Sequence, residues 1–103
     1  MAESMRIRAQ SKDGKTQVRV LMAHEMETGL RRDAAGQLVP AWHINEVSAE
    51  LNGKVVMTAE WGTAVAKNPF LQFFVKGGKP GDKVAILWKD NKGDSRRDEA
   101  TVT

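Results

Sequence analysis

With 103 residues the chain has room for one domain, because domains most often contain roughly 100–150 residues. The absence of cysteine excludes disulfides, thiolate metal ligands and any group carried on a sulfur atom. The formal net charge is +3, and Lys and Arg are interleaved with Asp and Glu along the sequence, which disfavours a nucleic-acid interface. We therefore expect a single domain, residues 1–103, with its core drawn from the 41% of residues that are apolar.

The amino terminus, MAESMR, lacks the apolar segment of a secretory signal, and no run of about 18 or more apolar residues occurs in the sequence. From the residues alone we expect a cytosolic chain with no membrane span and no membrane partner.

Turn-forming residues and short β-prone runs alternate along the chain, a spacing typical of β-sandwiches and barrels. The turns are marked by Asp13-Gly14, Asn52-Gly53, the stretch 77–82 and the stretch 91–94. The strands expected between them are about residues 5–10, 16–22, 42–51, 55–61, 70–76, 83–89 and 96–102. Seven short, mostly antiparallel strands predict an all-β fold, an immunoglobulin-like or fibronectin-like sandwich of two sheets.

The first two strands alternate between apolar and polar side chains, as strands do when only one face is buried. Met5, Ile7 and Ala9 share one face of the first strand, and Val18 and Val20 share one face of the second. We expect both sets in the core. The segment 25–37 that follows is polar and Gly-interrupted and shows no helical stripe, so we predict a long loop there.

The hairpin at Asn52-Gly53 can be assigned a register from its hydrophobic pattern. A two-residue loop would pair Leu51 with Lys54 and mix apolar with polar residues on both faces. A three-residue loop separates them, and we expect this second register. The core face would then consist of Val47, Ala49, Leu51, Val55, Met57, Ala59 and Trp61.

Two later strands are apolar on both faces, although a two-layer sandwich covers only one face of each strand. The strand at 70–76 carries Phe70 and Phe74 on one face and further apolar residues on the other, and the strand at 83–89 is similar. The second face needs a cover. A loop such as 25–37, a bulge that re-aims side chains, or a partner protein would supply one.

Candidates for catalysis and metal binding are few. The available imidazoles are His24 and His43, and no Ser lies in a nucleophile elbow such as G-x-S-x-G. In an extended chain Glu25 and Glu27 would point away from His24, and no second His follows at the spacing of a helical zinc site. The Gly-rich stretch 77–82 lacks phosphate-loop spacing and precedes a strand. We expect no catalytic residue, no metal and no cofactor.

Three tryptophans and a methionine-bearing loop remain as candidates for recognition. Trp61 and Trp88 fall in phase with apolar strand positions, which favours core positions, whereas Trp42 stays open to stacking on a ligand. Met26 either packs beneath the loop that begins near His24 or contacts a partner.

Five segments spread over nearly the whole chain resemble the Z-subunit family of the bacterial Sox (sulfur-oxidising) carrier complex. They are MRIRAQSKDG (5–14), VRVLMAHEMETGLRRD (18–33), PAWHINEVSAELNGK (40–54), AEWGTAVAKNPF (59–70) and GDKVAILWKDNKGDSRRDE (81–99). These segments are long and distinctive, so the resemblance is specific.

The resemblance implies a non-catalytic sandwich subunit that binds the Y subunit tightly as a heterodimer and contacts other Sox enzymes transiently. In that family the C-terminal arm of the Y subunit ends in a Gly-flanked cysteine that carries sulfur intermediates of thiosulfate oxidation. A chain without cysteine fits the supporting role. The resemblance also implies a periplasmic location, reached by export of the folded pair on the twin-arginine signal of the Y subunit.

The surplus apolar side chains and two loops supply the residues that we expect at the partner interface. They are Leu21, His24, Met26, Trp61, Asn68, Phe70, Phe74 and Trp88. The alternative function is a free-standing sandwich that binds a ligand, a sugar or RNA through Trp42, Arg31 and Arg32.

Overall fold

A computed structural model describes residues 3–103, so Met1 and Ala2 of the expected domain lie outside the described residues. Seven strands run through this range, and no helix interrupts them. The strands are β1 (Arg6–Lys12), β2 (Lys15–Leu21), β3 (Ile44–Leu51), β4 (Lys54–Glu60), β5 (Phe70–Lys76), β6 (Lys83–Asp90) and β7 (Ser95–Thr101). The predicted all-β fold of seven strands is confirmed, with strand ends close to the predicted bounds.

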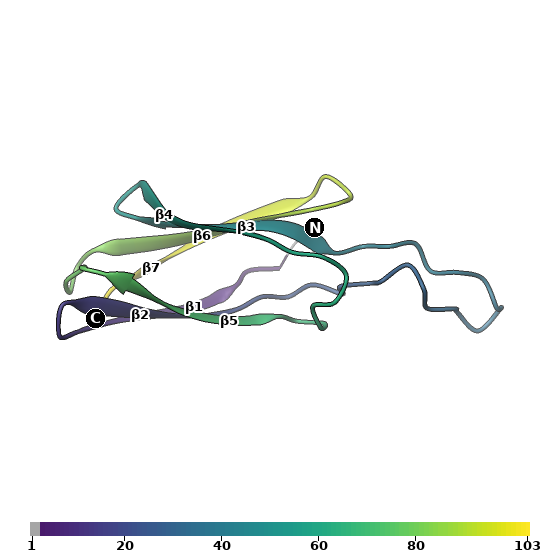
Figure 1. Ribbon diagram of the computed structural model, residues 1–103, viewed down its shortest axis with the longest axis horizontal. Helices are drawn as coiled ribbons and strands as arrows, with labels where there is room; N and C mark the ends of the chain where they lie inside the picture. The colour runs from purple at the N-terminus through teal and green to yellow at the C-terminus, as the bar shows by residue number, and fades with distance from the viewer. Residues whose placement is uncertain (1–2) are drawn as a thin grey trace.

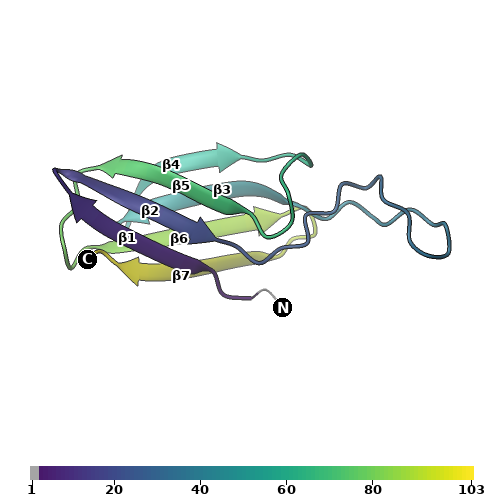
Figure 2. The same cartoon turned by 90° about the horizontal axis from the view of Figure 1, so that it is seen from below.

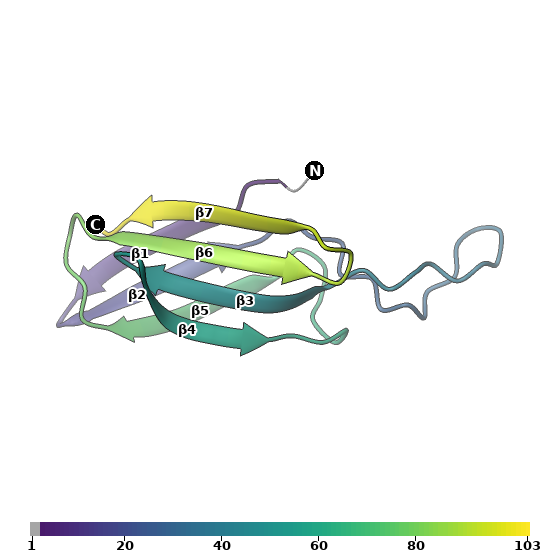
Figure 3. The same cartoon turned by 90° about the horizontal axis from the view of Figure 1, so that it is seen from above.

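The strands form two antiparallel sheets that pack face to face (Figure 1). The small sheet has the order β1-β2-β5, and the large sheet has the order β4-β3-β6-β7. β4 therefore lies beside β3, whereas the constant-type immunoglobulin order groups the fourth strand with the first, second and fifth. Along one side β1 approaches β7 (Figure 3), and there the N–H of Ser11 donates to the carbonyl of Thr103 (3.0 Å).

The core lies between the two sheets and is built from alternate residues of the strands. Val18 and Val20 of the small sheet and Val47 and Ile86 of the large sheet are fully buried. Met5 and Ala9 are also buried, so the faces predicted for the first two strands are confirmed. The polar residues between them point to solvent because successive strand side chains alternate sides.

The hairpin between β3 and β4 departs from the register expected from sequence. Leu51 pairs with Lys54 across a two-residue Asn52-Gly53 turn in which both residues have positive φ, as the tight primed turns of hairpins require. Glu50 then pairs with Val55, but Ala49 pairs with Met57, so Val56 is the extra residue of a β-bulge.

The bulge reconciles the tight turn with the hydrophobic pattern. It returns Met57 and Ala59 to the core face, where they pack against the buried cluster. Val55, predicted to lie in the core, falls on the outer face and is 55% exposed, so that part of the prediction was wrong.

The predicted long loop is confirmed and extends from the end of β2 to the start of β3. Its two limbs run side by side away from one end of the sandwich (Figure 2), held by isolated bridges between Glu27 and Trp42 and between Arg32 and Leu38. Because it projects outward, it does not cover the second apolar face of β5.

β5 and β6, the two strands that are apolar on both faces, differ in how their outward faces are covered. On β6 the outward-facing Ala85 is only 5% exposed, because Arg97 and Glu50 on the flanking strands form an ion pair (3.5 Å) across that face. On β5 the outward-facing Phe70 and Phe74 remain exposed. Within the described range no helix is long and apolar enough to cross a membrane.

Candidate partner-binding surface

The outer face of the small sheet gathers side chains from β1, β2 and β5 and is called here the basic face. The register aligns its residues in rows across the sheet. The rows are Arg6, Leu21 and Phe70; Arg8, Arg19 and Gln72; Gln10, Gln17 and Phe74; and Lys12, Lys15 and Lys76.

Three apolar side chains lie on the basic face without cover from residues 3–103. Phe70 is 62% exposed, Phe74 is 61% exposed and Leu21, which pairs with Phe70, is 41% exposed. The ammonium group of Lys15 lies 5.6 Å from the ring centroid of Phe74, within the range of a cation–π contact. Aromatic residues and Arg, both present on this face, are enriched at protein interfaces.

The charge on the basic face has one sign. Every charged residue in its rows is Lys or Arg, and none of them forms an ion pair within residues 3–103. The outer face of the large sheet is mixed instead, for it carries Glu46, Glu50, Glu60 and Glu99 beside Lys83, Lys89 and Arg97. The two outer faces thus differ in the chemistry they offer to a partner.

The eight residues expected at the interface do not form one surface. Leu21, Phe70 and Phe74 come together on the basic face. Trp88 is 1% exposed and Met26 is 5% exposed, so both belong to the core and are dropped from the proposed interface. Trp61, at the end of β4, is half-buried against the core, as predicted from its phase.

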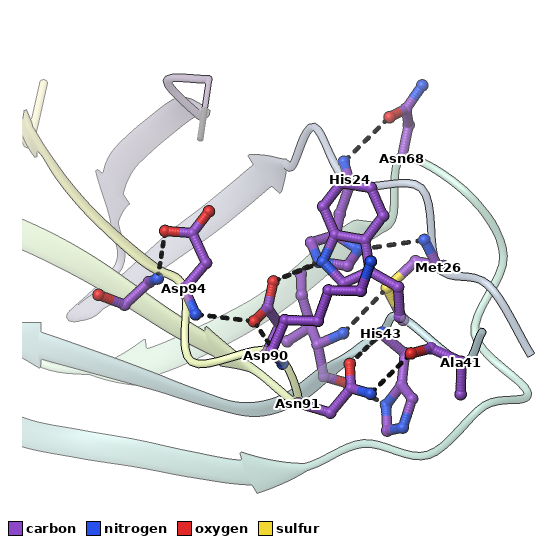
Figure 4. A network of polar contacts seen from close by, with 12 residues as sticks. His24, Met26, Ala41, His43, Asn68, Asp90, Asn91 and Asp94 are labelled. Atoms are coloured by element: carbon purple, nitrogen blue, oxygen red, sulfur yellow. Dashed lines mark hydrogen bonds and ion pairs between the residues drawn. The ribbon is translucent and has the colours of Figure 1, made fainter. Parts of the chain in front are cut away.

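The other two expected residues, His24 and Asn68, meet at the base of the projecting loop (Figure 4). The amide oxygen of Asn68 accepts a hydrogen bond from the backbone N–H of His24 at 3.1 Å. Asn68 itself is exposed, whereas His24 is 6% exposed and is likewise dropped from the interface. Together they tie the loop after β2 to the connector before β5.

A buried polar cluster surrounds His24 and joins β6 to this loop (Figure 4). The Nε2 atom of His24 lies 3.0 Å from Oδ2 of Asp90, and Nδ1 accepts the backbone N–H of Met26 at 3.0 Å. Since a backbone N–H can only donate, the ring proton lies on Nε2 and points at Asp90. Trp42 and Trp88 pack on the ring with centroids 5.0 and 5.2 Å away.

Asp90 is the acceptor at the centre of this cluster, and its side chain is inaccessible to solvent. Oδ2 also accepts the indole N–H of Trp42 at 2.8 Å, while Oδ1 accepts the backbone N–H groups of Lys92 and Asp94. Burial alone raises the pKa of Asp90, but the hydrogen bonds from His24, Trp42 and the backbone outweigh it and hold the pKa below its ordinary value. The carboxylate is therefore charged and fully engaged.

This arrangement serves structure, because both ring nitrogens of His24 are already committed. A general base needs a free lone pair within reach of a substrate proton, and Nδ1 is occupied by a backbone donor. A cavity of about 360 Å³ adjoins the cluster, but Glu25 and Lys67 on its wall pair with each other at 3.2 Å. Among the described residues no group of three His, Cys, Asp or Glu side chains is placed to hold a metal ion.

The residues named for the alternative function are also engaged in internal contacts. Trp42 donates to Asp90 and carries the ammonium group of Lys92 4.4 Å above its ring. Arg31 forms hydrogen bonds with both carboxylate oxygens of Glu27, and Arg32 donates to the carbonyl of Gly36. They stabilise the projecting loop rather than line a shared ligand site.

Sequence reasoning missed two features of this molecule. The cations of the basic face are spread over three strands, and only their alternation, as in Arg6 and Arg8, signals a common face. Asp90 was missed because its side-chain partners, Trp42 and His24, lie 48 and 66 residues away in sequence, a separation that no local pattern reveals.

A family model and a solved structure are similar to this chain. The family model described as Sulphur oxidation protein SoxZ matches residues 5–101. No curated protein matched the sequence. Among solved structures, a variant of the superoxide reductase (neelaredoxin) of Archaeoglobus fulgidus, in its reduced form, is similar with a TM-score of 0.61 and 20% identity. The match covers 97% of this chain and 86% of that one, and at this identity it shows a shared fold alone.

Proposed function

Because this chain belongs to the SoxZ family of sulphur oxidation proteins, we propose that it is the non-catalytic subunit that holds the Y subunit of a Sox carrier complex. In this proposal the cysteine-tailed arm of the Y subunit carries the sulfur intermediates of thiosulfate oxidation, and other Sox enzymes visit the pair transiently. The pair is exported folded to the periplasm on the signal of the Y subunit.

The observation that carries this proposal is the exposed apolar set on the basic face. Phe70 and Phe74 are each more than half exposed on a regular strand, and among the described residues neither a loop nor a bulge covers them. Exposed aromatic side chains gathered on one sheet face mark a site of protein–protein contact. Of the three covers considered from sequence, a partner protein remains.

The absence of cysteine supports the division of labour between the two subunits. This chain has no thiol on which sulfur could be carried, and its most buried imidazole, His24, is held between Asp90 and a backbone N–H. A rigid support is the role that these features fit.

The test is a calorimetric titration of the purified chain with a purified Y-type subunit of a Sox carrier complex. The variant with Phe70→Ser and Phe74→Ser loses apolar contact area and should bind at least about 100-fold more weakly, given about 1.4 kcal/mol for each factor of ten. Val55→Ser is the matched control, since Val55 is 55% exposed on the opposite outer face. Unchanged affinity in the double variant, or no binding by the unmodified chain, contradicts the proposal.

A further inference from the structure

The four sheet edges of this sandwich are protected to different degrees. An edge strand presents unpaired backbone N–H and C=O groups to any other strand, and proteins usually block such edges. The edge of β1 is covered, because Thr103 forms backbone hydrogen bonds with Ser11 and Ala9 and because Asp98 accepts the N–H of Met5. The edge of β7 lies beside β1 and consists largely of charged and polar residues.

The remaining two edges, β4 and β5, lie on the other side of the sandwich (Figures 2 and 3). β4 is interrupted by the bulge at Val56, a device that hinders strand pairing. β5 has no such device. It pairs with β2 over seven residues without a register shift, contains no proline, and has its only charge at Lys76.

The hydrogen bonds at the ends of β5 show which backbone groups face outward. The N–H of Met22 donates to Pro69 (2.9 Å), and the N–H of Gly77 donates to Gly14 (2.7 Å), which continues the β2–β5 register at both ends. Hydrogen-bonded pairs alternate along an antiparallel ladder. The residues whose N–H and C=O groups face the open edge are therefore Phe70, Gln72, Phe74 and Lys76.

The basic face is too small to hold a partner tightly without help. Three strands at about 4.8 Å spacing and seven residues at about 3.4 Å give a flat area of roughly 340 Å². Even if this flat area is doubled to allow for the uneven surface of the side chains, it falls short of the roughly 800 Å² that each partner contributes to an interface of standard size. The open edge of β5 adjoins the basic face and would enlarge the interface, since the outward-facing residues of β5 belong to both the face and the edge.

We propose that the edge of β5 accepts an extended strand of the partner subunit, so that the small sheet continues into the partner. This inference rests on the proposed function, because it states how the partner is held. Backbone hydrogen bonds along the edge supply affinity, as in other cases of strand addition, and the neighbouring side chains supply specificity. The added strand carries acidic residues on its outward side, where it borders the unpaired cations of the basic face.

The same charges argue against a second copy of this chain as the occupant. Joining two β5 edges would place two basic faces in one continuous sheet, with Lys15, Arg19 and Lys76 of each copy unopposed by any acid in the rows. Like charges brought together in this way oppose association. A partner with acidic side chains relieves the repulsion.

A proline substitution tests the edge separately from the face. Gln72→Pro removes an N–H that faces the open edge and leaves the ladder to β2 intact, since proline is tolerated where the N–H faces solvent. We expect it to weaken binding of the Y subunit about tenfold or more. Thr58→Pro is the matched control. Thr58 is an exposed residue of β4, and the alternation of hydrogen-bonded pairs along the β3–β4 ladder likewise directs its N–H to an open edge.

The outcome also separates the two proposals. If Gln72→Pro binds like the unmodified chain while the Phe70 and Phe74 double variant does not, strand addition is refuted and the proposed function stands. If both variants bind normally, both fail.

Amide exchange provides a second readout that does not depend on the folding of a variant. In the complex with the Y subunit, the amides of Phe70, Gln72 and Phe74 should exchange at least about tenfold more slowly than in the free chain. Rapid exchange at these amides in a saturated complex overturns the inference. Slow exchange in the isolated chain, together with dimer formation, also overturns it, because a second copy would then occupy the edge.

Discussion

At the scale of single residues, Asp90 determines how the projecting loop joins the sandwich. It collects donors from Trp42 and His24 of the loop and from the turn that follows β6, so one carboxylate holds three segments. Buried charges persist only when their hydrogen-bonding capacity is met, and here every oxygen is engaged. The cluster therefore fixes the base of the loop against the end of β6.

Replacing the carboxylate of Asp90 should destabilise the fold. We expect Asp90→Asn to lower the free energy of unfolding by about 2–4 kcal/mol, since an amide has one acceptor oxygen and turns an NH₂ group toward buried donors. Urea denaturation followed by tryptophan fluorescence measures the change. Glu60→Gln, an exposed residue of β4, is the matched control and should change the free energy by no more than about 0.5 kcal/mol. Equal stability of the two variants would contradict this account of Asp90.

Acid should weaken the fold through the same group. The pKa of Asp90 is lower in the folded chain than its ordinary value of 3.8, so the unfolded chain takes up the proton first as the pH falls. The stabilisation is complete well above pH 3.8 and is lost as the pH falls from there through the folded pKa. Urea midpoints measured from about pH 7 to about pH 2.5 should fall steeply for the unmodified chain. The midpoints should fall less for Asp90→Asn. Parallel curves for the two proteins would contradict the claim that Asp90 causes the loss of stability in acid.

At the scale of elements, strand positions were largely predictable because alternation and turn residues are local signals. The β3–β4 hairpin shows the limit of that reasoning. Its pattern required Leu51 and Met57 on one face, and the Asn-Gly turn required two loop residues. Both requirements are met only by an extra residue at Val56. A bulge within the apolar run 55–57 cannot be recognised from the local sequence pattern. Partner strands across the sheets were likewise unreadable, because pairing depends on distant contacts.

The turn after β5 offers a test at this scale. A Cβ on Gly78 would collide with the side chain of buried Thr16, whereas a Cβ on Gly53 would meet open space, and both glycines have positive φ. Gly53→Ala should therefore cost about 1–2 kcal/mol for its backbone conformation alone. Gly78→Ala should cost about 1–3 kcal/mol more from overpacking. Denaturant titration of both variants gives the difference, and a smaller loss at Gly78 would show that the turn shifts freely.

At the scale of the whole molecule, two sheets of one sandwich offer two different surfaces. The large sheet covers outward-facing Ala85 of β6 with ion-paired side chains, whereas the small sheet leaves the aromatic rings of β5 among unpaired cations. Surplus apolar residues on β5 and β6 were visible in the sequence, but only the register shows which strand is covered by its neighbours. The list of residues expected at the partner interface becomes shorter because distant contacts are not readable from sequence. His24, Met26 and Trp88 are buried by segments remote in sequence.

The most direct measurement of the central claim is hydroxyl-radical footprinting of the chain alone and in complex with the Y subunit. Oxidation of Phe70 and Phe74 should fall severalfold in the complex, while Val55 on the opposite face and Leu30 on the projecting loop, which is 82% exposed, should react as before. If Phe70 and Phe74 are oxidised equally in both states, the partner binds elsewhere and the basic face is not its site.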